Sequence, residues 1–344
     1  MKIIHFADLH IGSKFDRLPE GIKRDLNTKL RNAFLAIIGF ASENAISTIL
    51  MAGDIFDRNA VSLKDKKFFY DSIKANPGID FYYVRGNHDS NSRCVDAVEN
   101  LHVFDGLQTY VKGNVRIIGC EIEKDAASLY GHSPFTTDKF NILMLHGDIA
   151  NPKGPNAIDI KRLKDKNVNY LALGHIHKRK GGTLEGIHFE YPGCVLGRGF
   201  DETGEKGFLV FDTDDESATF HPMSDVLFEQ WDVPVNGMDE AKLKMEISRL
   251  LGNPDSSLIS EIRLTGKAAM DIDAEDLGRT FANRRLYLEI KNATKQALSY
   301  APSEKENSLR NLFVNKILSD PSIDDDRKER IISYGLSKLM KEEE

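Results

Sequence analysis

The stretch MKIIHFADLH (residues 1–10) places two polar side chains directly behind an apolar run. The run predicts a β-strand over residues 2–7, and Asp8 and His10 follow at its carboxyl end. Because residues two apart in an extended chain point to the same side, we expect both side chains to reach one metal ion. A carboxylate and an imidazole are ligands that divalent metal ions accept. The stretch therefore predicts part of a metal site at the end of a strand.

Four further stretches also carry polar residues at or just after the end of an apolar run: GDIFD (53–57), GNHD (86–89), HGD (146–148) and GHIH (174–177). A glycine before Asp54, Asn87 and His175 lets the backbone turn tightly there. Read singly, each stretch has a plain structural explanation, such as a helix cap or a structural histidine. Read jointly they do not, because five separate segments would all carry unneeded polar groups. The set predicts a two-metal phosphoesterase site, in which two ions hold a phosphodiester and activate a water molecule.

The first 220 or so residues alternate between strand-like and helix-like segments. Helices are predicted over 30–44 and 64–74. Strands are predicted over 2–7, 48–52, 81–84, 115–120, 141–145, 170–173, 188–191 and 208–212. This order predicts an α/β protein with a layered, mixed sheet. In open α/β sheets, ligands bind beyond the carboxyl ends of the strands, and the polar stretches fall there.

The pattern changes near Pro222. Strands over 228–233, 258–264 and 285–291, with helices over 238–251 and 273–283, predict a small α+β domain spanning residues 225–295 behind a first domain spanning 1–224. The last segment, residues 305–344, carries two amphipathic helices over 308–318 and 325–341. They predict a helical hairpin, which either packs on its own domain or docks onto a partner helix or coiled coil.

The composition is that of an ordinary soluble protein, with 344 residues, 41% hydrophobic and 29% charged, and a net charge of −7. This charge argues against nucleic-acid binding over the whole surface and leaves room for a local basic groove. No apolar run is long enough to span a membrane, and the first residues lack the features of a signal peptide. Three widely spaced cysteines predict a reducing, cytoplasmic compartment.

The five polar stretches resemble those of the calcineurin-like metallophosphoesterases, and they occur in the expected order over residues 1–213. Within that family the chain is most similar to the DNA-repair nuclease branch, which comprises SbcD, the bacterial YhaO group and the Mre-type nucleases. The segments YPG (191–193) and GEKGF (204–208) and the appended domains carry this finer similarity. It implies a nuclease domain over 1–224, a capping domain over 225–295, and a hairpin over 305–344 that docks onto an SMC-like ATPase with long coiled coils.

The resemblance also implies a role for each site residue. The first metal ion would be held by Asp8, His10, Asp54 and His177, and the second by Asp54, Asn87, His146 and His175. His88 would contact the scissile phosphate and assist the leaving oxygen, with the Asp89 carboxylate as its orienting partner. The usual metal of the family is Mn²⁺, and the ligand types here also permit Fe²⁺ or Zn²⁺. A homodimer is a further expectation from the family.

One departure concerns Asp57-Arg58 and Arg85, which match the related serine/threonine phosphatases. Some nuclease relatives instead carry a histidine near Asp57, which argues against assigning Asp57 a part in exonuclease polarity.

The leading hypothesis is a two-metal DNA exo- or endonuclease subunit of a double-strand-break repair complex, in which a metal-activated water attacks the phosphodiester. Lys178, Arg179 and Lys180 follow the last motif and are the predicted DNA-backbone contacts. The alternative enzyme is a small-substrate phosphodiesterase or protein phosphatase on the same scaffold. A third hypothesis, a non-catalytic adaptor of the ATPase, is disfavoured by the complete set of ligands.

Overall fold

The computed structural model describes residues 1–57, 61–89, 98–131, 134–151, 153–223, 225–296, 308–324, 327–328, 330–332 and 334–336. The chain divides into two compact units, which are residues 1–229 with 257–259, and residues 230–256 with 260–344. Arg58 and Cys94 lie outside the described residues, whereas Cys120 and Cys194 are buried free thiols. No helix in the described part of the chain combines the length and the apolar character that a membrane crossing requires.

The first unit contains two mixed six-stranded sheets. In the first sheet the order is β12 (Ser217–Pro222), β11 (Gly207–Asp212), β1 (Lys2–Phe6), β2 (Thr48–Ala52), β3 (Asp80–Val84) and β4 (Leu101–Val103). In the second it is β5 (Gln108–Lys112), β6 (Val115–Gly119), β7 (Phe140–His146), β8 (Tyr170–Gly174), β10 (Ile187–Tyr191) and β9 (Lys180–Leu184). Strands β1 to β4 are parallel to one another, as are β6, β7, β8 and β10.

The two sheets pack face to face and share one core. Alternate residues of their strands point either into this core or away from it. In β7, Ile142 and Met144 join Leu50 of the first sheet in the core between the sheets. The intervening Leu143 and Leu145 face the opposite side, where α3 (Ile122–Gly131) contributes Leu129 to a second core. This alternation follows from the two-residue period of a strand.

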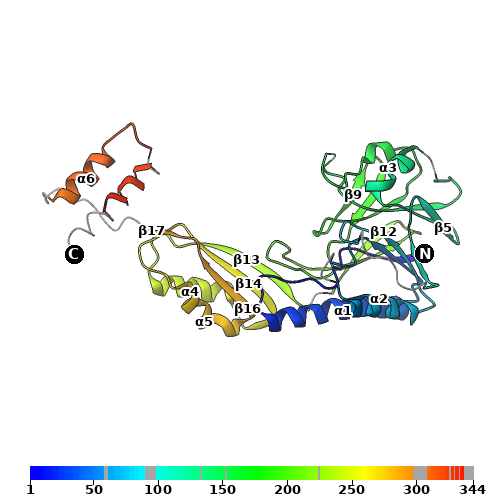
Figure 1. The fold of residues 1–344 in the computed structure, drawn as a ribbon, viewed down its shortest axis with the longest axis horizontal. Helices are drawn as coiled ribbons and strands as arrows, with labels where there is room; N and C mark the ends of the chain where they lie inside the picture. The colour runs from blue at the N-terminus through cyan, green and yellow to red at the C-terminus, as the bar shows by residue number, and fades with distance from the viewer. Residues whose placement is uncertain are drawn as a thin grey trace. The chain divides into compact units, whose positions relative to one another are not determined.

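Helices cover the outer face of the first sheet as well. Phe34 of α1 (Glu20–Glu43) stacks on Phe69 of α2 (Leu63–Lys74) with ring centroids 5.1 Å apart, and it also contacts Phe6 of β1. Figure 1 shows α1 and α2 on one side of the sheets and α3 on the other. The unit therefore has four layers, and the predicted layered α/β class with a mixed sheet is confirmed.

Several elements differ from the prediction. The first helix begins at Glu20, ten residues before the predicted start, because its exposed first turns give almost no apolar periodicity. Strand β9 was missed because all five of its residues are exposed and two are glycines. The short or half-exposed strands β4, β5 and β12, and helix α3, were missed as well.

A three-stranded sheet has the order β13 (Leu227–Pro234), β14 (Asp255–Thr265) and β16 (Arg285–Asn292), and all of it except residues 227–229 and 257–259 belongs to the second unit. Helices α4 (Glu240–Leu251) and α5 (Ala274–Phe281) cover one face of this sheet (Figure 1), burying Leu243, Ile247 and Leu277 against it. Lys267–Ala268 (β15) and Lys295–Gln296 (β17) form a two-stranded sheet. Helix α6 spans Leu309–Leu318, and much of the predicted second hairpin helix lies outside the described residues.

Candidate metal centre

Four of the predicted site residues adopt left-handed backbone conformations, namely Asp8 (φ 52°), His10 (φ 49°), Asp54 (φ 52°) and His175 (φ 94°). Each costs about 1–2 kcal/mol for a non-glycine residue, and such strain gathers at functional sites. The expected extended geometry of Asp8 and His10 is therefore wrong, because β1 ends at Phe6. The loop after β2 holds them in place instead: the amide of Asp8 donates to Gly53 O and that of His10 to Asp54 O, both at 3.0 Å.

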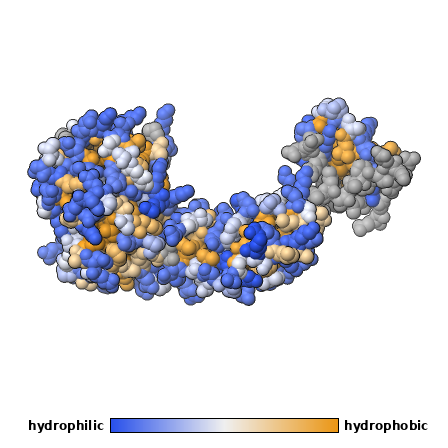
Figure 2. Space-filling view, turned by 180° about the vertical axis from the view of Figure 1, so that it is seen from behind, coloured by the Kyte–Doolittle hydropathy of each residue, from blue (hydrophilic) through white to orange (hydrophobic). Residues whose placement is uncertain are grey.

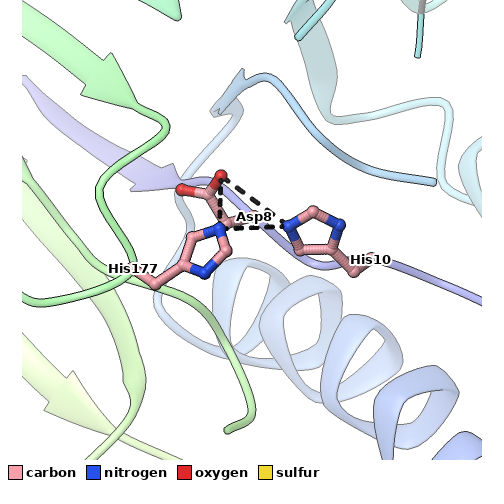
Figure 3. Close-up of side chains that lie close together, drawn as sticks. All are labelled: Asp8, His10 and His177. Atoms are coloured by element: carbon pink, nitrogen blue, oxygen red, sulfur yellow. Dashed lines mark hydrogen bonds and ion pairs between the residues drawn. The ribbon is translucent and has the colours of Figure 1, made fainter. Parts of the chain in front are cut away.

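The first group of candidate ligand atoms comprises Asp8 Oδ1, His10 Nε2 and His177 Nε2 (Figure 3). The two imidazole nitrogens lie 3.3 Å apart, and Asp8 Oδ1 lies 3.6 Å from that of His177 and 4.0 Å from that of His10. Asp8 and His10 are buried, whereas 27% of the His177 side chain is exposed. A cation at about 2.0–2.2 Å from each atom fits a triangle of this size, so the donor set suits a divalent metal.

The second group comprises Asp8, Asp54 and His146. His146 Nε2 lies 3.3 Å from both Asp54 Oδ2 and Asn87 Oδ1. The other ring nitrogen, Nδ1, lies 2.9 Å from Ala52 O, so this contact assigns a proton to Nδ1. Nε2 carries a second proton in the imidazolium and has a free lone pair in the neutral ring. Asp54 faces both groups, because its Oδ2 is also 3.9 Å from His10 Nε2.

His175 lies beside the second group and is not a member of any three-residue group among the described residues. Its ring centroid is 5.2 Å from that of His146, and its backbone amide donates to the Asp8 carboxylate at 3.0 Å. His175 therefore lies beside the cluster. Its backbone amide, and not its imidazole, makes the hydrogen bond with Asp8.

His88 lies next to the first group, with its ring centroid 4.9 Å from that of His10. Its Nδ1 is 3.1 Å from Asp57 Oδ1, so the carboxylate that contacts this imidazole is Asp57 and not the expected Asp89. Asp89 is fully buried and points inward, where its carboxylate accepts hydrogen bonds from the amides of Ile55 (3.2 Å), Phe56 (2.9 Å) and Gly86 (3.1 Å). Asp89 therefore holds the loops that carry the site together.

Burial dominates the electrostatics of the cluster. It raises the pKa of Asp8 to about 6 and that of Asp89 to about 6. Burial alone would lower the pKa of His146, but the hydrogen bond and charge of Asp54, together with the charge of Asp8 and the hydrogen bond to Ala52 O, outweigh it and raise the value to about 9. Buried carboxylates that face one another are costly unless a positive charge compensates them, which is a further reason why this donor set suits cations.

Sequence reasoning missed three residues that contact the candidate ligands. Asn156 donates to Asn87 Oδ1 at 3.2 Å, and no sequence signal marks it. Glu202 Oε1 lies 2.6 Å from His177 Nδ1, and the Arg198 guanidinium donates to the same oxygen at 3.0 Å. Arg198 and Glu202 lie between YPG (191–193) and GEKGF (204–208). Those two stretches carry the similarity to the nuclease branch, and the residues between them had no predicted role.

The predicted DNA contacts and the phosphatase-like arginine have different surroundings. Lys178, Arg179 and Lys180 directly follow His177 and are exposed, and Arg179 Cζ lies 4.7 Å from the centre of the Phe220 ring. Arg85 is turned to Glu121, with Nη1 3.0 Å from Oε1.

The site also requires a glycine at position 174. A Cβ atom there would lie 1.9 Å from Ala52 O and 2.9 Å from His146 Nδ1. We expect Gly174→Ala to lower the free energy of unfolding by about 1–3 kcal/mol or more, as overpacking does, and to displace His146. Gly39→Ala is the matched control: no heavy atom lies within 4 Å of that position in α1, so a gain of about 0.5–1 kcal/mol is expected. Urea unfolding measures both, and equal midpoints would contradict the steric argument.

Two facing mixed sheets with Asp and His side chains gathered beyond the strand ends define a metal-dependent phosphoesterase. The model of the calcineurin-like phosphoesterase superfamily domain matches residues 1–216, and the chain belongs to this superfamily, whose members bind two divalent metal ions.

Named relatives agree with this membership. Over 283 residues the chain is 31% identical to the uncharacterized metallophosphoesterase YhaO of Bacillus subtilis strain 168, covering 75% of this chain and 68% of YhaO. It is 24% identical over 355 residues to exonuclease subunit 1 of Enterobacteria phage T4, covering 97% of each chain. It is 25% identical over 301 residues to the DNA double-strand break repair protein Mre11 of Sulfurisphaera tokodaii, covering 78% of this chain and 74% of that protein.

Proposed function

We propose that this phosphoesterase is a DNA nuclease that uses two divalent metal ions, and that it acts as a subunit of a double-strand-break repair complex. The observation that carries the proposal is the convergence of candidate ligand atoms from five separate segments on one edge of the sheets. Asp54 faces a residue of each group, because its Oδ2 lies 3.3 Å from His146 Nε2 and 3.9 Å from His10 Nε2. This is the arrangement that a carboxylate shared by two ions needs.

The residues divide into two proposed ligand sets, both containing Asp54. The first ion would be held by Asp8, His10, Asp54 and His177, and the second by Asp54, Asn87, His146 and His175. When bound, such a pair lowers the pKa of a coordinated water and neutralises charge on the phosphodiester in the transition state. Mn²⁺ is the proposed metal, and oxygen and imidazole donors also accept Fe²⁺ or Zn²⁺.

His88 is the proposed catalytic residue outside the ligand sets. Its Nδ1 is held by Asp57 Oδ1 at 3.1 Å, which leaves the other ring nitrogen for the substrate. From there the imidazole would donate a proton to the leaving oxygen of the DNA strand. The contact with the Asp57 carboxylate fixes the orientation of the ring.

DNA is favoured over a small or phosphoprotein substrate for two reasons. The relatives named above include an exonuclease subunit and a double-strand break repair protein. In addition, Arg85, which matches the phosphatases in sequence, is engaged with Glu121, and the exposed Lys178, Arg179 and Lys180 remain as backbone contacts next to His177. Contacts of this kind bind phosphates without reading the base sequence.

The C-terminal segment is the proposed docking element for an SMC-like coiled-coil ATPase. Helix α6 exposes Leu309 (70%), Leu312 (59%) and Leu318 (46%), and Figure 2 shows apolar surface on this segment. Exposed leucines on one helix suit a helical partner. Replacing Leu309 and Leu312 by glutamate should abolish co-purification with a co-expressed ATPase of this type, and unchanged co-purification would refute the docking role. Sedimentation of the wild type tests the proposed homodimer.

The function itself is tested with two substrates. The full chain is incubated with a labelled linear DNA duplex and, separately, with bis-p-nitrophenyl phosphate, each with Mn²⁺ or with EDTA. Hydrolysis of both substrates in Mn²⁺ and of neither in EDTA is the expected result. Cleavage of the small diester alone, also after addition of the ATPase partner, would support the alternative of a small-substrate phosphodiesterase.

A further inference from the structure

The loop between β10 and β11 is built against His177, the most exposed member of the first ligand group. The amide of Cys194 donates to His177 O at 3.2 Å. Gly193 has a φ of 81°, and a Cβ atom there would lie 2.9 Å from the same oxygen. The backbone of this loop thus packs closely against the main chain at His177.

The side chain of Glu202 completes the contact on the ring itself. Its Oε1 lies 2.6 Å from His177 Nδ1, and only 9% of its side chain is exposed. Arg198 holds this carboxylate with three hydrogen bonds: its amide donates to Oε2 at 2.8 Å, and its guanidinium donates to Oε1 at 3.0 Å and to Oε2 at 3.5 Å.

These contacts determine which nitrogen of His177 carries the proton. The Arg198 guanidinium also lies 3.0 Å from Nδ1, and it could donate there only if Nδ1 carried no proton. The Glu202 carboxylate has no proton to donate, and its contact with Nδ1 is the shorter one at 2.6 Å. Glu202 is therefore the acceptor, and Nδ1 is the donor. The proton on Nδ1 leaves Nε2 with a free lone pair, which faces Asp8 and His10 (Figure 3).

We propose that Glu202 is a positioning residue for metal binding, which fixes the tautomer and orientation of His177, and that Arg198 holds Glu202 in place. The inference rests on the proposed function, because it takes His177 Nε2 as a ligand of the first ion. Carboxylates placed behind a ligating imidazole raise its basicity and hold its ring. The segment 193–206, which the motifs of the family leave without a role, would thus serve one of the two metal positions.

Metal titration of the metal-free full chain tests this assignment. Isothermal titration with Mn²⁺ is carried out on the wild type, Glu202→Ala and Glu202→Gln. We expect one of the two binding steps to weaken by about 10–100-fold in both variants, while the other step is unchanged, because His177 serves one ion. Glu205→Gln is the matched control, since Glu205 is an exposed carboxylate of the same loop and should leave both steps unaffected.

A second measurement reads the tautomer directly. Nitrogen-15 spectra of the imidazoles in the metal-free protein should show His177 with its proton on Nδ1, assigned by comparison with His177→Ala. In Glu202→Ala the same ring should show a mixture of tautomers, whereas Glu205→Gln should match the wild type. A purely structural role of Glu202 would not change this signal.

The outcomes distinguish a failure of the Glu202 assignment from a failure of the proposed function. If the wild type binds two ions and both Glu202 variants bind them with wild-type affinity, the inference is overturned and the proposed function stands. If the wild type binds fewer than two ions, the proposed function fails and the inference with it. Circular dichroism checks folding, and if Glu202→Ala is unfolded, Glu202→Gln decides, because it keeps the shape of the side chain.

Discussion

Replacing Asp54 by alanine is expected to lower kcat/KM for a DNA duplex by at least about a thousandfold, the upper range for the loss of one charge-stabilising group from an active site. Asp54 Oδ2 lies 3.3 Å from His146 Nε2 and 3.9 Å from His10 Nε2, so its loss removes an oxygen from both proposed ligand sets. It also removes the partner that raises the pKa of His146. Initial rates with Mn²⁺, and the metal content of the purified protein, measure the effect.

The control for Asp54→Ala is Asp271→Ala, which removes an exposed carboxylate from the second unit. It should retain wild-type rates and metal content. Thermal melting of both variants shows whether the fold is kept. If Asp54→Ala retains two bound ions and a rate close to that of the wild type, Asp54 is not shared between two metal positions.

Replacing His88 by alanine is expected to lower kcat by about 10²–10⁴-fold, the range for loss of a general acid, while both metal ions still bind. The ring lies beside His10 and is held by Asp57, which is the position of a proton donor next to the ligand groups. Single-turnover cleavage of a labelled duplex measures the rate, and metal titration measures the binding. Unchanged DNA cleavage by this variant would refute the assigned role.

Variants of Asp57 and Asp89 test which carboxylate supports His88 in this role. Asp57→Asn should lower the cleavage rate with little change in stability, because Asp57 contacts the His88 ring. Asp89→Asn should instead lower the free energy of unfolding by about 1–3 kcal/mol, since three backbone amides lose a charged acceptor. A variant pair with the opposite pattern would restore Asp89 as the orienting partner of His88.

The strands that carry the site could be predicted because each is a compact apolar run. Predicted strand 48–52 and the observed β2 have the same bounds, and β8 extends the predicted strand by a single residue, Gly174. Such runs are buried on both faces, so burial alone selects them. The start of α1 at Glu20 could not be predicted, since the first buried residue of this helix is Leu26 and the turns before it give almost no apolar periodicity.

The local geometry of the site was less accessible to prediction. Asp8 and His10 reach the cluster through left-handed backbone conformations that only the packing of two loops against each other imposes. Likewise, the sequence points to Asp89, the neighbour of His88, whereas the contact with the ring is made by Asp57, 31 positions away. The folded loops turn the Asp57 side chain toward the His88 ring and the Asp89 side chain toward buried backbone amides.

The sequence alone determined the α/β class, the kinds of ligand and the strand ends at which they stand, because these depend on short-range periodicity and on the chemistry of single side chains. The tertiary structure decided which atoms meet. His10 and His177 are 167 positions apart, and His177 and Glu202 are 25 positions apart. Contacts at such separations depend on how the two sheets and their loops pack, so the proton on His177 and the carboxylate behind it follow from the fold and not from any local pattern.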